Sequence, residues 1–133
     1  MRIFLDTNVL VAAFATRGLC GDLLALVLAE HELVLGERTI SELKRVLARE
    51  LRLPREMIGE IERFLREQAV ATVRAAEPLD APVSSDDAWI LAEALAAGAE
   101  AFVTGDRELL AENFDLPCPR LAPRALWERL RRS

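Results

Sequence analysis

The feature that most constrains this chain is a regular alternation of short apolar runs with longer segments whose apolar residues recur every three or four positions. Short runs of this kind are typical of buried strands, and the longer period is typical of amphipathic helices. The predicted strands span residues 2–5, 33–35, 70–73, 101–104 and 117–121. The predicted helices span residues 20–30, 39–52, a segment from Pro54, 86–97, a segment from about Asp106 and a segment from Pro123. This order predicts an α/β fold with a parallel sheet of four to five strands and helices on both faces.

Local signals support several of these boundaries. Ser84 and Ser85 are good N-caps for the helix over 86–97. The prolines within 117–121 restrict that strand to an edge of the sheet, because proline cannot donate to a central ladder. The residues directly after the first strand, 6–8, are predicted to form a turn.

The size of the chain limits its organisation. With 133 residues, of which 52% are hydrophobic, the chain can bury one core, and we expect a single domain over 1–133. The two cysteines, Cys20 and Cys118, are far apart and form neither a disulfide framework nor a zinc spacing. The longest uncharged stretch, 7–16, is too short to span a membrane, and the N-terminus has no secretory pattern, so we expect a cytoplasmic protein.

Acidic residues stand where predicted strands lead into helices. Ligands of parallel sheets bind beyond the carboxyl ends of the strands, and right-handed crossovers bring these junctions to one edge. The carboxylates at four such junctions are Asp6, Glu42, the pair Asp86 and Asp87, and Asp106.

Each of these residues also has a purely structural explanation. Glu42 follows Thr39 at capping-box spacing, and Asp106 fits the N-cap of the next helix. Asp86 and Asp87 would complement a helix dipole in its first turn. Taken together, converging carboxylates repel one another unless a cation neutralises them. Hard oxygen ligands without histidine or cysteine indicate Mg²⁺ or Mn²⁺ rather than zinc.

The same residues carry a family resemblance. In order along the chain, the segments Asp6-Thr7-Asn8-Val9-Leu10, Ser41-Glu42-Leu43, Asp87-Ala88-Trp89-Ile90-Leu91-Ala92 and Val103-Thr104-Gly105-Asp106 resemble the motifs of the PIN-domain family. Within that family the chain is most similar to the VapC-type toxin ribonucleases of toxin–antitoxin operons. The resemblance extends from Arg2 to about Trp127.

The resemblance implies a three-layer PIN-like domain and a metal-dependent endoribonuclease that leaves a 5′-phosphate. It implies Mg²⁺ or Mn²⁺ as cofactor, an RNA substrate, an antitoxin partner and a homodimer. The metal-ligand and catalytic roles it implies belong to Asp6, Glu42, Asp87 and Asp106, with Asn8 and Thr104 in support. The role of Asp86 stays open. Ala88 stands where close relatives often carry a polar residue, a departure that concerns the substrate rather than catalysis.

Two other functions compete with this one. An aspartyl-nucleophile phosphotransferase also begins with an aspartate at a strand end, but it needs a second aspartate where this chain has Asn8, and Lys44 is its sole candidate lysine. A catalytically inactive PIN-like module could bind RNA or protein without cutting, but it would have no reason to keep mutually repelling carboxylates.

The net charge of −5 argues at first against a nucleic-acid partner. Without the four predicted ligands, however, the remaining charge is only −1. The remaining charges are also unevenly distributed. Residues 37–74 hold nine basic residues against six acidic ones other than Glu42, and residues 120–132 hold five against one.

Overall fold

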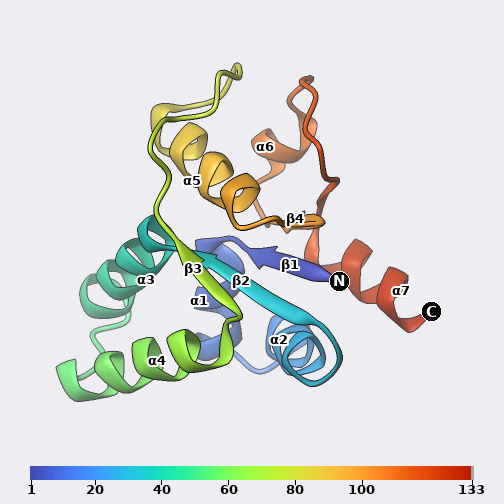
Figure 1. Ribbon diagram of the computed structural model, residues 1–133. Helices are drawn as coiled ribbons and strands as arrows, with labels where there is room; N and C mark the ends of the chain where they lie inside the picture. The colour runs from blue at the N-terminus through green and yellow to red at the C-terminus, as the bar shows by residue number, and fades with distance from the viewer. Residues whose placement is uncertain (133) are drawn as a thin grey trace.

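The computed structural model describes residues 1–132, and its centre is a five-stranded sheet in the order β3-β2-β1-β4-β5 (Figure 1). All four neighbouring pairs are parallel, as expected. The strands are β1 Arg2–Leu5, β2 Glu32–Gly36, β3 Ala71–Val73, β4 Ala101–Val103 and β5 Arg120–Leu121. The short strand β5 lies at an edge of the sheet, as predicted, and Pro117 and Pro119 of the predicted strand precede it.

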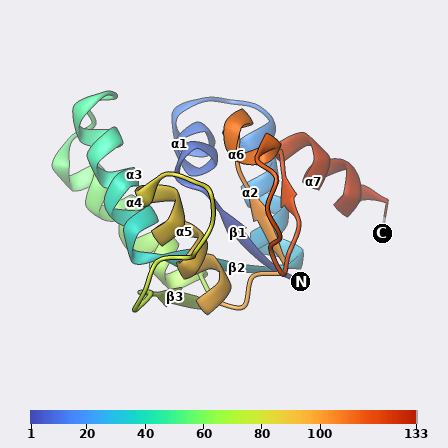
Figure 2. The ribbon, with the colours of Figure 1, turned by 90° about the horizontal axis from the view of Figure 1, so that it is seen from above.

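The helices of residues 1–132 cover both faces of the sheet. They are α1 Thr7–Ala15, α2 Leu19–Glu30, α3 Glu37–Arg49, α4 Arg55–Gln68, α5 Ser85–Ala96, α6 Arg107–Ala111 and α7 Pro123–Arg131. In Figures 1 and 2, α5 and α6 lie on one face, and the other helices lie on the opposite face. The predicted α/β class with two helical layers is therefore confirmed.

Alternate residues of the strands feed two separate hydrophobic cores. Ile3 and Leu5 of β1 pack toward α1–α4 and α7, whereas Phe4 packs toward α5 and α6. The rings of Phe4 and Phe102 stack 5.4 Å apart on neighbouring strands. Both faces of β1 are thus buried, which is why the strand reads as a continuous apolar run.

One predicted turn is wrong. Residues 6–8 do not form a turn, because Thr7 already begins α1, with Asp6 as its N-cap. The N-cap of α1, Asp6, directly follows the last residue of β1, so no loop separates the strand from the helix. A second, smaller difference is that α3 begins at Glu37 rather than at Thr39.

The order of the strands places a crevice at the carboxyl ends of β1 and β4. From β1 the chain proceeds to β2 and β3 on one side, and it later returns to β4 and β5 on the other side. Ligands of open α/β sheets bind at such a reversal of strand order. Among residues 1–132 no single helix has the length and apolar character to cross a membrane, although α1 and α2, bent by 106°, meet those two criteria as a pair.

Candidate functional site

Asp6 occupies the centre of the site, directly after β1, and is 5% exposed. Its Oδ1 accepts a 2.8 Å hydrogen bond from the Thr7 backbone N–H, and its Oδ2 accepts one of 2.8 Å from the Thr104 hydroxyl. Burial raises the pKa of Asp6 to about 6, against the effect of these two hydrogen bonds, and the charges of Glu42 and Asp87 raise it further. A nearby cation would favour the charged form of this carboxyl group.

Asn8 and Thr104 join Asp6 in one hydrogen-bonded network. Asn8 Nδ2 lies 3.3 Å from both Asp6 Oδ2 and the Thr104 hydroxyl oxygen, and Asn8 Oδ1 accepts a 2.7 Å hydrogen bond from the Gly105 N–H. The Thr104 hydroxyl also accepts a 3.1 Å hydrogen bond from the Asp106 N–H. The network links the start of α1 to the end of β4, so both predicted supporting residues contact Asp6.

Glu42 reaches the site from α3, where its Oε2 accepts a 2.8 Å hydrogen bond from the Thr7 hydroxyl. The capping-box explanation for Glu42 is wrong, because the N-cap of α3 is Gly36 and Thr39 lies inside the helix. Thr7 was not singled out from the sequence as a site residue. Its only signal is its place beside the strand-end aspartate.

Asp87, rather than Asp86, faces the groove. Asp87 is half-buried in the first turn of α5, and its backbone N–H donates to Ser84 Oγ at 3.2 Å, which confirms Ser84 as the N-cap. Burial raises the pKa of Asp87; the hydrogen bond to Ser84 opposes this effect, and the charges of Asp106 and Asp86 add to it. Asp86 itself is exposed and does not line the groove.

Asp106 caps α6, as its structural explanation predicted. Its Oδ1 accepts hydrogen bonds from the backbone N–H groups of Glu108 and Leu109, at 2.9 and 3.2 Å. These bonds involve only one of the two carboxylate oxygens. Capping therefore does not exclude a second role for this residue.

These side chains line one open groove of about 570 Å³. Its acidic lining residues include all four predicted ligands and Glu50: Asp6, Glu42, Glu50, Asp87 and Asp106. Helices α1 and α3 also contribute apolar side chains to the groove, among them Val11, Ala12 and Val46. The structure thus brings together the four carboxylates that the sequence placed at four separate junctions.

The chemistry of the donors fits a hard divalent cation. All four are carboxylates, and the raised pKa values of Asp6 and Asp87 reflect negative charge gathered in a partly desolvated place. The carboxylates line the groove without closing around a common point. Within residues 1–132, no three His, Cys, Asp or Glu side chains are already arranged to hold one ion.

Glu93 is a buried carboxylate near the site that was not predicted from the sequence. Glu93 of α5 is 1% exposed, and its Oε1 accepts a 3.0 Å hydrogen bond from the Arg38 backbone N–H at the start of α3. Its Oε2 lies 3.3 Å from the Ala75 N–H, which donates to it after β3. Helix α3 has no side-chain cap from its own N-cap, Gly36. Glu93 therefore supplies this cap from another helix and ties α3, which carries Glu42, to α5, which carries Asp87.

Comparison with known proteins agrees with this geometry. A family profile described as PIN domain matches residues 2–108. The fold is similar to that of PAE2754 from Pyrobaculum aerophilum, with a TM-score of 0.65 and 21% identity over 100% of this chain and 91% of that chain. It is also similar to a chain in the crystal structure of VapBC2 from Rickettsia felis bound to a DNA fragment from their promoter. That TM-score is 0.64, with 14% identity over 92% of this chain and 98% of that chain.

No curated protein matches the sequence significantly. The two structural likenesses concern the fold alone, whereas the profile match spans β1 through the start of α6 and includes all four groove carboxylates. The chain belongs to the PIN-domain family.

Proposed function

We propose that this PIN-domain protein is a metal-dependent endoribonuclease. The observation that carries the proposal is the convergence of Asp6, Glu42, Asp87 and Asp106, from four separate chain segments, on one groove at the carboxyl ends of β1 and β4. The carboxylates repel one another, and the raised pKa of Asp6 reflects this in part. A cation bound among them would relieve the repulsion and attract a phosphodiester to an otherwise acidic surface.

These four residues would hold the metal, each with free acceptor capacity. Glu42 keeps Oε1 and Asp106 keeps Oδ2 outside the hydrogen bonds described above. Asp6 Oδ1 accepts one hydrogen bond and retains a further lone-pair direction, whereas Oδ2 accepts hydrogen bonds from both Thr104 and Asn8. Bound Mg²⁺ or Mn²⁺ would supply a Lewis acid for the phosphate and a water of lowered pKa. Thr104 and Asn8 orient Asp6, and Thr7 orients Glu42.

The partners belong to the same proposal. RNA is the substrate that we propose, and the biological role is that of the toxin of a toxin–antitoxin pair in the cytoplasm. The Rickettsia felis VapBC2 structure, which shares the fold, supports a protein partner of the antitoxin kind. We extend the proposal to a homodimer, which sedimentation of the purified protein would test.

Cleavage of a mixed single-stranded RNA pool with Mg²⁺ or Mn²⁺ tests the activity. We expect Asp6→Asn to reduce the cleavage rate by more than about 100-fold, because loss of even a group that supports a ligand costs 10- to 100-fold. Asparagine caps a helix as well as aspartate does, so this variant removes the charge and keeps the cap of α1.

Asp106→Asn is the matched second variant, because asparagine would also keep the cap of α6. Loss of cleavage in both variants without a fall in Tm would assign the loss to the metal site rather than to folding. Equal cleavage by Asp6→Asn and the native protein, or no cleavage with either metal, would rule out the nuclease.

One observation favours the alternative of a module that binds RNA or protein without cutting. Within residues 1–132, the carboxylates of the groove are not arranged around a common point that could hold a metal ion. For such a module, isothermal titration of Mn²⁺ should detect no binding, and RNA should bind and remain intact. The nuclease proposal expects binding of Mn²⁺ that Asp6→Asn weakens.

A further inference from the structure

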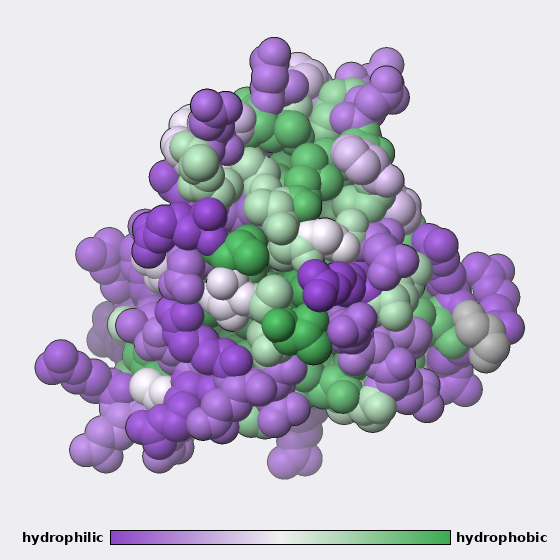
Figure 3. Space-filling model, in the orientation of Figure 1, coloured by the Kyte–Doolittle hydropathy of each residue, from purple (hydrophilic) through white to green (hydrophobic). Residues whose placement is uncertain are grey.

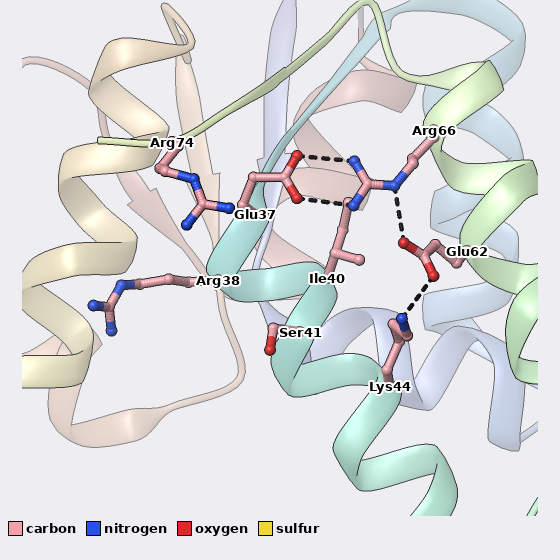
Figure 4. A pocket seen from close by; sticks show the side chains of 8 residues that line it. All are labelled: Glu37, Arg38, Ile40, Ser41, Lys44, Glu62, Arg66 and Arg74. Carbon is pink, nitrogen blue, oxygen red and sulfur yellow. Dashed lines mark hydrogen bonds and ion pairs between the residues drawn. The ribbon is translucent and has the colours of Figure 1, made fainter. Parts of the chain in front are cut away.

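A second group of charged side chains lies along α3, beside the carboxylate groove. A hollow of about 580 Å³ there, which we call the basic pocket, is lined by four cations and two carboxylates (Figure 4). They are Arg38, Lys44, Arg66 and Arg74, and Glu37 and Glu62. Figure 3 shows hydrophilic residues crowded over α3 and α4 in this part of the surface.

The two carboxylates of the basic pocket are already engaged by two of the cations. Arg66 donates two hydrogen bonds of 2.8 Å to Glu37 and one of 3.0 Å to Glu62, and Lys44 lies 2.8 Å from Glu62. Arg38 and Arg74 have no carboxylate at ion-pair distance within residues 1–132. The pocket therefore carries an excess charge of two. It comes from Arg38 and Arg74, which form no ion pair among the residues that the structure describes, although the charge of Arg74 also helps to lower the pKa of Glu37.

Arg38 is held in a conformation suited to binding an anion. Its guanidinium lies 4.6 Å from the centre of the Trp89 ring, and its backbone N–H is bound by Glu93. Stacking uses the face of the guanidinium, so its N–H donors, which lie in the plane, stay available. An arginine fixed in this way loses less side-chain entropy when it binds a phosphate.

Arg74 is placed on the same side of the pocket by the same buried carboxylate. It directly follows β3, at the carboxyl edge of the sheet, and the next residue, Ala75, donates its backbone N–H to Glu93 Oε2. One buried side chain thus anchors both backbone segments that carry the unpaired arginines. In Figure 4, Arg38 and Arg74 both lie on the side of Glu37 away from Arg66; the Arg38 side chain points away from Glu37, and the Arg74 guanidinium points toward it.

The basic pocket adjoins the carboxylate groove along α3. Arg38 and Glu42 are four residues apart in this helix and share one face, about 6 Å apart along its axis. A polyanion whose one phosphate lies at the carboxylate groove would meet these two arginines with a neighbouring phosphate. Guanidinium groups match phosphate oxygens in a bidentate geometry.

We infer that Arg38 and Arg74, with Trp89 behind Arg38, bind a backbone phosphate of single-stranded RNA that flanks the scissile bond. The identity of the polyanion as RNA rests on the proposed function; the anion site itself rests on the two unpaired arginines. The site draws RNA to a face of a protein whose net charge is −5.

Binding of a fluorescein-labelled 12-nucleotide single-stranded RNA in metal-free buffer, followed by anisotropy, tests the inference without cleavage. The double variant Arg38→Gln/Arg74→Gln should weaken binding by at least about 10-fold, because each arginine donates charged hydrogen bonds. The slope of log K against log salt should fall in magnitude by about 0.7, the value for one lost phosphate contact to a single strand. Repulsion by the carboxylate groove acts on every variant equally and cancels in the comparison.

Arg124→Gln/Arg132→Gln is the matched control. It removes the same charge from two exposed residues of α7 and its C-cap, far from α3. We expect this control to keep the affinity within about twofold and the slope unchanged. Arg38→Lys keeps the charge but loses the planar stack, and it should bind with intermediate affinity.

Three outcomes would overturn the inference. The first is equal affinity and slope for Arg38→Gln/Arg74→Gln and the native protein, and the second is an equal loss in the control variant. The third is displacement of the RNA by a 12-residue polyglutamate as effectively as by unlabelled RNA, which would make the pocket a site for acidic peptides. If RNA binding depends on Arg38 and Arg74 but the protein does not cleave RNA, the anion site would be supported, and only the proposed nuclease activity would be ruled out.

Discussion

At the scale of single residues, Asp6 links the chemistry of the groove to the stability of the fold. Its folded pKa is raised from 3.8 to about 6, first by burial, so the folded protein holds this proton more tightly than the unfolded chain does. The resulting stabilisation is fully present below about pH 3.8 and is lost as the pH rises through 6. In chelator-treated buffer, the free energy of unfolding of the native protein relative to Asp6→Asn should fall by about 2–3 kcal/mol between pH 4 and pH 7.5.

Urea unfolding of both proteins at the two pH values measures this difference. The comparison with Asp6→Asn cancels the titration of all other groups, provided that the variant leaves their surroundings intact. A native-minus-variant difference that stays constant from pH 4 to pH 7.5 would contradict the raised pKa of Asp6.

At the scale of elements, the junction between β2 and α3 depends on a close approach of Glu93 to Gly36. A Cβ at position 36 would collide with the Glu93 carboxylate and come within 2.9 Å of the Glu93 Cβ. Gly36→Ala should therefore lower the free energy of unfolding by about 1–3 kcal/mol, the usual cost of overpacking. It should also shift α3, and with it Glu42, so cleavage should fall as well.

Gly59→Ala is the matched control for this prediction. Gly59 lies inside α4, and a Cβ there would meet nothing within 4 Å. The same chemical change should raise stability by up to about 1 kcal/mol, because alanine is the better helix former. The urea unfolding midpoints of the two variants test this prediction. Equal shifts of the midpoint, or a higher midpoint for Gly36→Ala, would show that Glu93 does not constrain the junction.

At the scale of the whole molecule, the carboxylate groove exists only in the folded chain. Asp6 and Asp106 lie 100 positions apart in sequence, and β1 and β4 bring them together. Mg²⁺ should therefore bind the folded state alone and raise Tm in a concentration-dependent manner, by the equivalent of about 1.4 kcal/mol at ten times Kd. Differential scanning fluorimetry over a Mg²⁺ series measures the effect.

Asp106→Asn separates metal binding from general salt effects in this experiment. The variant keeps the cap of α6 and should lose most of the rise in Tm with Mg²⁺. An equal rise in both proteins would indicate a nonspecific effect of the salt and contradict a metal site at the groove.

The order of strands and helices could be predicted because each of those elements has a local signature. The apolar run of β1 and the amphipathic period of α3 report burial on both faces or on one face, whatever the rest of the fold. The four junction carboxylates follow from the same logic, since parallel strands end at one edge of a sheet. Helix α1 was not predicted, because its N-cap Asp6 directly follows β1 and no loop marks where the strand ends and the helix begins.

The sequence by itself therefore determined the α/β class and the edge at which Asp6, Glu42, Asp87 and Asp106 gather. Their metal-binding roles, and the single domain over 1–133, stay predictions. The family resemblance already favoured Asp87 over Asp86, and Asp87 does line the groove. Only the tertiary structure decided that Thr7 binds Glu42. It alone decided that Glu93 caps α3 and leaves Arg38 stacked on Trp89. The physical reason is the sequence distance over which each interaction acts. Helical and strand periods depend on residues that are close in sequence. Hydrogen bonds and ion pairs between residues far apart in sequence form only after packing has brought those residues together.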